Sequence, residues 1–377
     1  MRRRTGGNIY DRHVVRAARA NGLCVAIASV ESAREVIDAV ARERPTVVLG
    51  DSIAFGPIAD ALPHLPFVPL VALAHMPVRG RAVRVVAAAA HVIAVSAALA
   101  REVRTQGARR VSVVRPGCDG VPAARRPRRH DRVHVLCVAN RSRAKGVDVL
   151  LRAAARVPAL QFELVGDVLD PRYARSLRPL ISAVAPRLRV HAAMPPSQLA
   201  RSFARADIVA VPSRSEGYGI VAAEAIAHGL PVVASDLPAL REVLGDAGTF
   251  VRPDDVPGLA RALTRLADPK ARRRAVNIAR RRALTLPTWS EAERSVVSLL
   301  VRSMRVHEHG GDEMPPRGVK SPKRKRQYEH IKKSELKRGR SNKTAERIAA
   351  ATTNKTRRKK GETKSGRKRS STRKKKS

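Results

Sequence analysis

Short apolar runs alternate with helical patterns through most of this chain. In the first half the runs lie at 24–28, 46–49, 67–73, 91–95 and 111–114, and in the second half at 133–139, 162–165, 188–191, 208–211, 231–234 and 249–251. Strands that alternate with helices form parallel sheets that carry helices on both faces. The pattern therefore predicts an α/β protein.

A stretch rich in Pro and Arg, 122–132, divides the runs into two sets. We expect two Rossmann-like domains, residues 1–125 and residues 133–305, and a separate tail, residues 315–377. In open parallel sheets, ligands bind beyond the carboxyl ends of the strands. A central cleft between the two domains is therefore the expected ligand site.

The segment from Glu216 to Glu224 is the first candidate for chemistry. It follows a buried-strand pattern, and residues 218–228 have the pattern of a helix. Gly217 and Gly219 let a ligand approach the backbone, and the free N–H groups at a helix start favour an anion. Glu224 is expected about two helical turns further on, close to the same face. On spacing alone, an ordinary strand, loop and helix with two solvated glutamates remains the alternative.

This segment resembles the two-glutamate signature of the retaining family 4 glycosyltransferases, which have the GT-B fold. Further stretches resemble the same family in the expected order, at 111–119, 135–151, 164–167 and 229–248. The resemblance covers roughly residues 5–305 and is strongest from 111 to 265. It implies GT-B architecture, with a final helix at 289–301 that returns to the first domain.

The resemblance also implies a metal-independent hexosyltransferase that moves a sugar from a nucleoside diphosphate-sugar to an acceptor with retention. It implies catalytic roles for Glu216, Lys145 and His75, and donor binding by Arg141, Gly217, Tyr218, Gly219, Ile220 and Glu224. Lys145 would stabilise the departing diphosphate, Glu224 would accept hydrogen bonds from the ribose, and His75 would contact the donor sugar. The leaving phosphate would help to deprotonate the acceptor, so no protein nucleophile is assigned.

Two departures from the family stand out. The family places an arginine five positions before the lysine, where this chain has Asn140, and Arg141 is the nearest substitute. The segment from Thr5 to Arg12, with Gly6 and Gly7, resembles a glycine loop near the phosphates or acceptor. Only four residues of the chain precede Thr5, so the leading strand is missing. Either the start lies upstream of Met1, or the protein lacks a central strand and is impaired.

Targeting and metal signals are weak. The amino terminus has no apolar secretory segment, no run is long enough to span a bilayer, and the three cysteines lack disulfide or metal spacing. We expect a cytoplasmic protein that could associate with the inner face of the membrane. We expect no metal or other cofactor. The donor base, the sugar, the acceptor and the oligomeric state stay open.

The tail differs in composition from the rest of the chain. Residues 315–377 hold 26 Lys and Arg against four Glu, a net +22 of the total +43, whereas residues 1–314 contain just two lysines, Lys145 and Lys270. We expect two short helices, 327–338 and 341–351, in an otherwise disordered segment. Nucleic acid or an anionic membrane surface is the expected partner. The alternative function is therefore a degenerate transferase that carries a nucleic-acid-binding tail, and Met314 could begin a separate fused protein.

Overall fold

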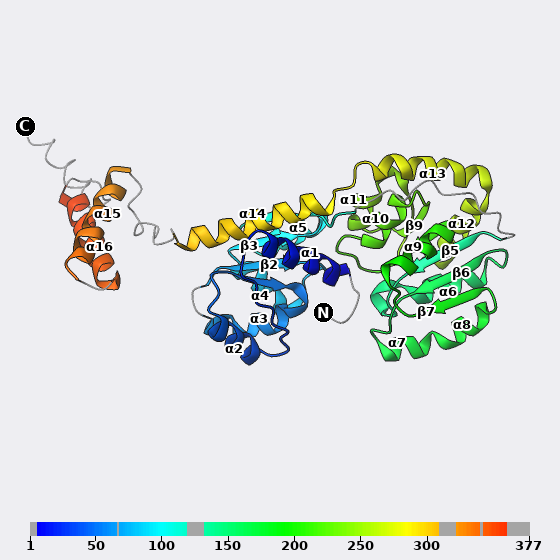
Figure 1. Ribbon diagram of the computed structural model, residues 1–377, viewed down its shortest axis with the longest axis horizontal. Coiled ribbons are helices and arrows are strands. Elements are labelled where there is room, and N and C mark those ends of the chain that lie inside the picture. The colour runs from blue at the N-terminus through cyan, green and yellow to red at the C-terminus, as the bar shows by residue number, and fades with distance from the viewer. Residues whose placement is uncertain (1–5, 66–67, 119–131, 309–321, 340–341, 360–377) are drawn as a thin grey trace, which may run out of the picture. The chain divides into compact units, whose positions relative to one another are not determined.

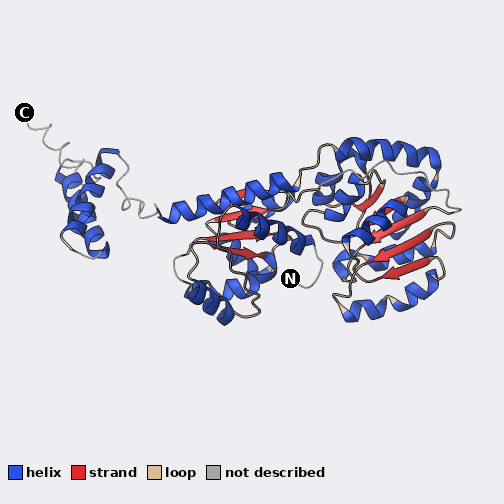
Figure 2. Cartoon of the chain, viewed as in Figure 1, coloured by secondary structure: helices blue, strands red, loops and turns tan. Residues whose placement is uncertain are grey.

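The computed structural model describes residues 6–65, 68–118, 132–308, 322–339 and 342–359 (Figure 1). They fall into two compact units, Met1–Met304 and Arg305–Ser377. The first unit contains two parallel sheets with helices packed against them (Figure 2). The α/β class with parallel sheets expected from the sequence is confirmed.

The first sheet has the strand order β1-β2-β3-β4, and all of its pairs are parallel. Its strands are β1 (Val48–Asp51), β2 (Leu70–Ala74), β3 (His91–Ala94) and β4 (Val111–Val113). The helices of this half are α1 (Gly6–Ala20), α2 (Ala33–Glu43), α3 (Phe55–Ala61), α4 (Val83–Ala88) and α5 (Ala97–Thr105). Every residue of β2 is buried, as expected for a central parallel strand covered on both faces.

The second sheet has the order β10-β9-β8-β5-β6-β7, again with parallel pairs throughout. Its strands are β5 (His134–Val138), β6 (Gln161–Val165), β7 (Leu188–His191), β8 (Ile208–Val211), β9 (Val232–Ser235) and β10 (Gly248–Val251). The helices are α6 (Val147–Ala155), α7 (Pro171–Ser176), α8 (Arg178–Val184), α9 (Pro196–Arg205), α10 (Ile220–Ala227), α11 (Pro238–Leu244), α12 (Val256–Ala267) and α13 (Pro269–Ala283).

The chain crosses between the two halves at two places that lie side by side. The Cys118 N–H donates to the carbonyl of Pro287 at 2.8 Å. A Cβ on Gly117 would lie 2.0 Å from the Trp289 nitrogen, so only glycine allows the crossings to come this close. A continuous cluster of buried apolar residues also joins the first sheet to the α10 and α11 side of the second half.

The last helix of the first unit, α14 (Trp289–Glu308), packs on the first half of the chain, as expected from the resemblance. The Trp289 ring stacks on His13 at 3.8 Å and meets the edge of Tyr10 at 5.9 Å. Glu293, one turn further on, accepts hydrogen bonds from His13 at 2.7 Å and Arg16 at 2.6 Å. These contacts fix α1 against α14.

Two expectations for the first half were wrong. Gly6 and Gly7 do not form a loop, because they are the first two residues of α1. Tyr10, Val14 and Ala17 are buried at helical spacing, and this stripe favours a helix over a loop. The expected strand 24–28 is irregular, and Ile27 is 52% exposed, since no strand of either sheet pairs with it.

The described residues of the second unit from 322 on form the helices α15 (Pro322–Lys337) and α16 (Asn342–Lys359), which pack against each other. Tyr328 of α15 and Ala345, Ala349 and Thr353 of α16 are buried. These helices are longer than the two short ones expected. Their full length was not predicted, because the narrow apolar stripe is hard to recognise among the surrounding charged residues. The remaining tail residues that we expected to be disordered lie outside the described ones.

Within the described ranges, no helix has both the length and the apolar character required to cross a bilayer.

Candidate active site

Lys145 and Glu216 meet at the carboxyl edge of the second sheet. Lys145 ends the short 3-10 turn between β5 and α6, and Glu216 lies in the loop between β8 and α10. The Lys145 ammonium donates to Glu216 Oε1 at 2.7 Å, and the Ser213 hydroxyl donates to the same oxygen at 2.7 Å. Gly146 has φ 62°, and a Cβ there would lie 2.0 Å from the Pro212 carbonyl oxygen. The glycine after Lys145 therefore lets the two loops touch.

An ion-pair network holds the loop between β8 and α10 in place. The Arg214 guanidinium donates to both Asp148 oxygens, at 2.9 and 2.8 Å, and to Asp254 at 2.7 Å. Burial alone would raise the pKa of Asp148, but hydrogen bonds from Arg214 and Tyr173 outweigh it and lower that pKa. A bidentate guanidinium–carboxylate pair constrains direction as well as distance. The network therefore fixes the start of the loop that carries Glu216.

Glu224 lies on α10 and is partly buried. Burial raises the pKa of this carboxyl to about 7. Among the described residues, no side chain or backbone group donates a hydrogen bond to it. A partly buried carboxylate without a donor is unfavourable, so hydroxyl groups of a ligand would stabilise its charged form.

The amino terminus of α10 lies between the two glutamates. Gly219 caps it with φ 102°, a conformation that favours glycine, and Ile220 is the first helical residue. Tyr218 is buried, and burial raises the pKa of its hydroxyl well above the usual range. The backbone N–H groups expected to bind an anion therefore lie beside Glu216, while the Tyr218 ring contributes packing.

Arg141 and Asn140 follow β5 directly. The Asn140 amide oxygen accepts from the Asp167 N–H at 2.9 Å, so Asn140 has a structural contact where the family has an arginine. The Arg141 N–H donates to the Asp167 carbonyl at 2.7 Å. Within the described part of the chain, the buried Arg141 Nε has no hydrogen-bond partner. Arg141 therefore retains a donor for an anion at the strand end.

His75 lies beyond the carboxyl end of β2, beside the signature loop of the other half. A Cβ on Gly217 would lie 1.7 Å from the His75 carbonyl oxygen, so the two halves touch directly here. His75 Nε2 lies 3.0 Å from Asp11 Oδ1 and 3.9 Å from Asp51 Oδ1. These three residues also form a set whose ligand atoms, all within 4.8 Å of one another, could hold a metal ion.

The structure adds contacts that sequence reasoning missed. The Glu242 carboxylate on α11 accepts from the backbone N–H groups of Ala97 and Ala98, at 2.8 and 3.2 Å, and from Arg115 at 2.7 Å. It therefore caps α5 of the opposite half. Asp51 could have been found as a polar residue at a strand end. Glu242 follows a strand and was open to a role as a helix cap, but neither its partner α5 nor the role of Asp11 could be predicted, because the partners are distant in sequence.

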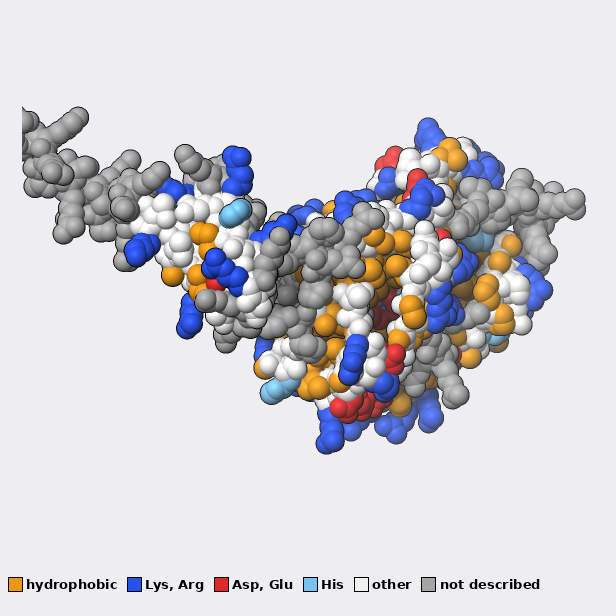
Figure 3. All heavy atoms as spheres, turned by 60° about the vertical axis from the view of Figure 1, so that its left-hand side comes forward, with side chains coloured by type: hydrophobic (Ala, Val, Ile, Leu, Met, Phe, Trp, Pro, Cys, Tyr) orange, Lys and Arg blue, Asp and Glu red, His pale blue; other side chains and the backbone are white. Residues whose placement is uncertain are grey.

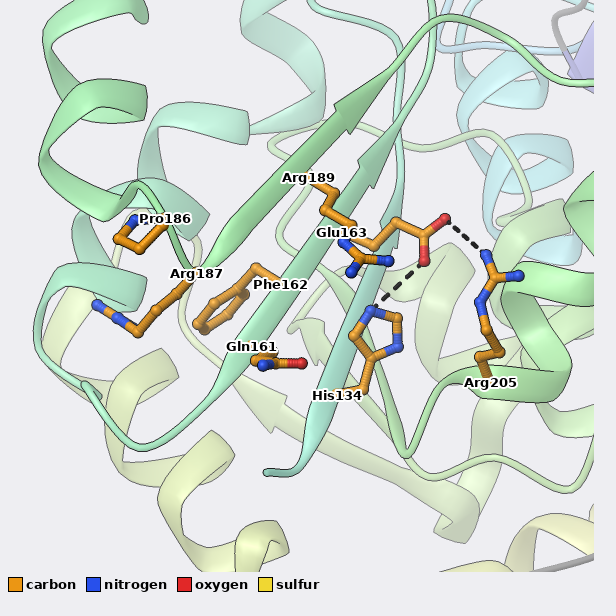
Figure 4. A pocket seen from close by; sticks show the side chains of 8 residues that line it. All are labelled: His134, Gln161, Phe162, Glu163, Pro186, Arg187, Arg189 and Arg205. Atoms are coloured by element: carbon orange, nitrogen blue, oxygen red, sulfur yellow. Dashed lines mark hydrogen bonds and ion pairs between the residues drawn. The ribbon is translucent and has the colours of Figure 1, made fainter. Parts of the chain in front are cut away.

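A separate polar cluster lies at the amino ends of β5, β6 and β7 (Figure 4). The buried Glu163 accepts from Ser202 at 2.6 Å and lies 3.4 Å from both His134 and Arg205. A cavity of about 200 Å³ adjoins the cluster. Lys145 and Glu216 lie at the opposite, carboxyl edge of this sheet, so we interpret Glu163 as the group that bonds α9 to the sheet.

Comparison with known proteins bears on the second half most directly. Residues 132–268 match the family model described as glycosyl transferases group 1. D-inositol 3-phosphate glycosyltransferase of Thermomonospora curvata is 36% identical over 209 residues, covering 47% of this chain and 48% of that protein. MMP alpha-(1->4)-mannosyltransferase of Mycolicibacterium hassiacum is 32% identical over 167 residues, covering 42% and 40%. The chain thus spans about half the length of the curated relatives it matches.

Solved structures match more of the chain. Sucrose-phosphate synthase of Thermosynechococcus elongatus aligns with a TM-score of 0.68 at 19% identity, over 80% of this chain and 94% of that one. HepE of Anabaena in complex with UDP-glucose aligns with a TM-score of 0.66 at 18% identity, over 79% and 96%. Residues 132–268 therefore match the glycosyl transferases group 1 family model, and the part of the chain that these structures cover has the GT-B fold.

Proposed function

We propose that this chain transfers a sugar from a nucleoside diphosphate-sugar to an acceptor. The observation that carries the proposal is the arrangement of Lys145, Glu216 and Glu224 around the start of α10. Lys145 bonds to Glu216, the start of α10 follows Glu216 in the chain, and the partly buried Glu224 carboxylate, without a donor among the described residues, lies on the same helix. Relatives that act on sugars, and the UDP-glucose complex of HepE, support this choice of donor.

Each group has one task in this proposal. Lys145 and Arg141 neutralise the diphosphate together with the N–H groups of Gly219 and Ile220, since fixed charges and dipoles stabilise a leaving group best. Glu224 accepts hydrogen bonds from the ribose hydroxyls. The carboxylate of Glu216 lies at the donor sugar, where it can favour positive charge at the anomeric carbon.

The stereochemical course and the metal requirement extend the proposal. We propose retention, with the acceptor attacking from the side that the phosphate leaves and giving its proton to a phosphate oxygen. Positive charge at the diphosphate comes from Lys145 and Arg141, so no divalent ion is required in this scheme. Product anomers resolved by NMR, and activity measured in the presence of a chelator, test these two points separately.

Calorimetric titration of UDP, GDP and ADP into the full chain tests the donor site. One of the three diphosphates is expected to bind, and Lys145→Ala and Glu224→Ala are each expected to weaken it by about 1–3 kcal/mol, the range for lost charge-assisted or buried hydrogen bonds. Lys270→Ala is the matched control, because Lys270 is the one other lysine in residues 1–314. A folded protein that binds none of the three would contradict the proposal.

For the tail we propose binding to nucleic acid. The second unit presents α15 and α16 as a packed pair, with the Gln327 amide donating to the Thr356 hydroxyl at 3.2 Å. Among the described basic side chains of these helices, Arg326, Lys333, Arg347 and Lys355 are exposed and Arg324 is buried, and basic side chains are widespread on the face in Figure 3. Charge of one sign on a rigid surface binds phosphates by releasing their counterions.

Binding of duplex DNA at several salt concentrations tests this second activity. We expect affinity to fall steeply with salt, by about a thousandfold or more between roughly 50 and 200 mM if six or more phosphates are neutralised. Deleting residues 315–377 should abolish the binding. Binding that survives the deletion, or that vesicles of anionic lipid compete away while DNA of equal charge does not, would count against nucleic acid as the partner.

A further inference from the structure

Three polar side chains from separate elements converge at the carboxyl edge of the first sheet. Asp11 comes from α1, Asp51 ends β1, and His75 follows β2. His75 Nε2 lies 3.0 Å from Asp11 Oδ1, with side-chain exposures of just 8% and 15%. Burial of a charged or polar pair is tolerated when the two groups bond each other, and this pair does so.

The His75 ring is held on several sides. Tyr10 meets it edge-on, with ring centroids 5.1 Å apart, and a Cβ on Gly7 would lie 3.3 Å from His75 Cδ2. The His75 backbone N–H donates to the Ser52 hydroxyl at 3.2 Å. The ring therefore has little freedom to turn. Among the described residues, no group bonds to the other ring nitrogen, Nδ1.

An ionised carboxylate can only accept hydrogen bonds. Nε2 must therefore carry the proton when it bonds to Asp11, and a neutral imidazole then has its lone pair on Nδ1. The second carboxyl, Asp51, does not reverse this choice. Its nearest oxygen lies 3.9 Å from Nε2, beyond hydrogen-bond distance, and burial raises the pKa of its carboxyl.

We propose that Asp11 is a positioning residue that sets the tautomer of His75, so that Nδ1 accepts a hydrogen bond from a hydroxyl of the sugar being transferred. This inference rests on the proposed transferase function. It gives α1 a role at the site that differs from the glycine loop expected there. Gly7 provides room for the ring, and Asp11, one turn further on, supplies the partner.

The variant Asp11→Asn distinguishes the effect of the His75 tautomer from the effect of side-chain shape at position 11. The amide has the size of the carboxylate, but its NH₂ group can donate to Nε2, which would move the ring proton to Nδ1 and turn an acceptor into a donor. We expect kcat to fall about 100-fold, the scale for losing one aligned hydrogen bond in the transition state. The calorimetric Kd for the nucleoside diphosphate should stay within about twofold of the parent, because Lys145 and Glu224 are untouched.

Two controls accompany this variant. Asp11→Glu keeps the carboxylate and should recover part of the lost kcat. Asp38→Asn removes a carboxylate from the same half at an exposed position on α2, where the side chain is 65% exposed, and should leave kcat unchanged.

Nitrogen-15 shifts of the His75 ring provide a readout that does not depend on activity. With His75 assigned by comparison with His75→Gln, the full chain should show a protonated Nε2 and an unprotonated Nδ1, and Asp11→Asn should reverse the two. A protonated Nδ1 in the parent overturns the proposal, even if Asp11→Asn fails to fold. So does unchanged kcat in a folded Asp11→Asn. Loss of activity in chelator that Mn²⁺ restores, with shifts of the His75 nitrogens on adding Mn²⁺, would assign the cluster to a metal instead.

If the full chain binds no nucleoside diphosphate but shows the expected His75 shifts, the proposed function fails while the Asp11–His75 geometry stands. If the diphosphate binds and the shifts are opposite to those expected, only the inference about Asp11 fails.

Discussion

Glu224→Gln is expected to make the folded protein more stable above neutral pH by about 3 kcal/mol. The pKa of this carboxyl is raised from 4.5 to about 7 by burial. Each pKa unit corresponds to about 1.4 kcal/mol, so charging the group in the folded state costs about 3 kcal/mol more than in the unfolded state. A neutral amide of the same shape avoids that cost.

The sign of the pH dependence follows from the same shift. Below about pH 4.5 the carboxyl is protonated in both states, so it imposes no penalty. Between about pH 4.5 and 7 the unfolded chain loses this proton and the folded chain keeps it, so stability falls as pH rises. Denaturant melts of Glu224→Gln at pH 5 and pH 8 should differ less than those of the parent.

Glu43→Gln, an exposed change on α2, reports the general effect of removing one acidic side chain from a basic protein. If Glu224→Gln and Glu43→Gln change the stability of the protein equally at both pH values, the Glu224 carboxylate does not carry an uncompensated burial cost. The gain in stability should be accompanied by weaker nucleoside diphosphate binding, because the amide is a poorer acceptor for two ribose hydroxyls. Stability and binding are therefore expected to move in opposite directions at this position.

Gly217→Ala is expected to reduce kcat/KM about 100-fold with little loss of nucleotide binding. The added Cβ would lie 1.7 Å from the His75 carbonyl oxygen and 2.6 Å from its carbonyl carbon. These are backbone atoms of the opposite half, so the overlap is relieved only if the halves separate at the site. A misplacement of about 1 Å between reacting groups costs about two orders of magnitude in rate, and the overpacking should lower the free energy of unfolding by about 1–3 kcal/mol.

Steady-state kinetics and nucleotide calorimetry on the same preparation check this prediction. Gly56→Ala in α3 is the matched control, since its added Cβ would lie at an ordinary 3.5 Å from the Arg81 side chain. If Gly217→Ala retains the parent kcat/KM, direct packing of Gly217 on His75 is not part of the working enzyme.

The second half of the fold could be predicted from sequence because its signals are local. The expected strands 188–191 and 208–211 have the bounds of β7 and β8. Lys145 and Glu216 both follow strands of one parallel sheet, so topology alone brings them to one edge. The contact between them was not read from the sequence, because it depends on Gly146 passing the Pro212 carbonyl.

The first half was harder because its deciding contacts are tertiary. Apolar residues at 24–28 have the pattern of a strand, but a strand must pair with a neighbouring strand. Among the described residues, none of the four strands of the first sheet pairs with this segment. The cap of α5 by Glu242 joins residues 145 positions apart. No periodicity in the sequence reports such a pair.

The neighbouring crossings at Cys118 and Pro287 have a consequence for how two substrates bind. Lys145 and Glu224, which we propose bind the donor, belong to one half and His75 to the other, so the crossings tether two proposed partial binding surfaces to each other. A ligand held by one surface meets the second at a high effective concentration, without a second diffusional search. The apparent affinity for a second substrate then depends on the length and stiffness of these two crossings as well as on its own contacts. Lengthening the segment that contains Gly117 would weaken the coupling between the two substrates while leaving the affinity for each one alone unchanged.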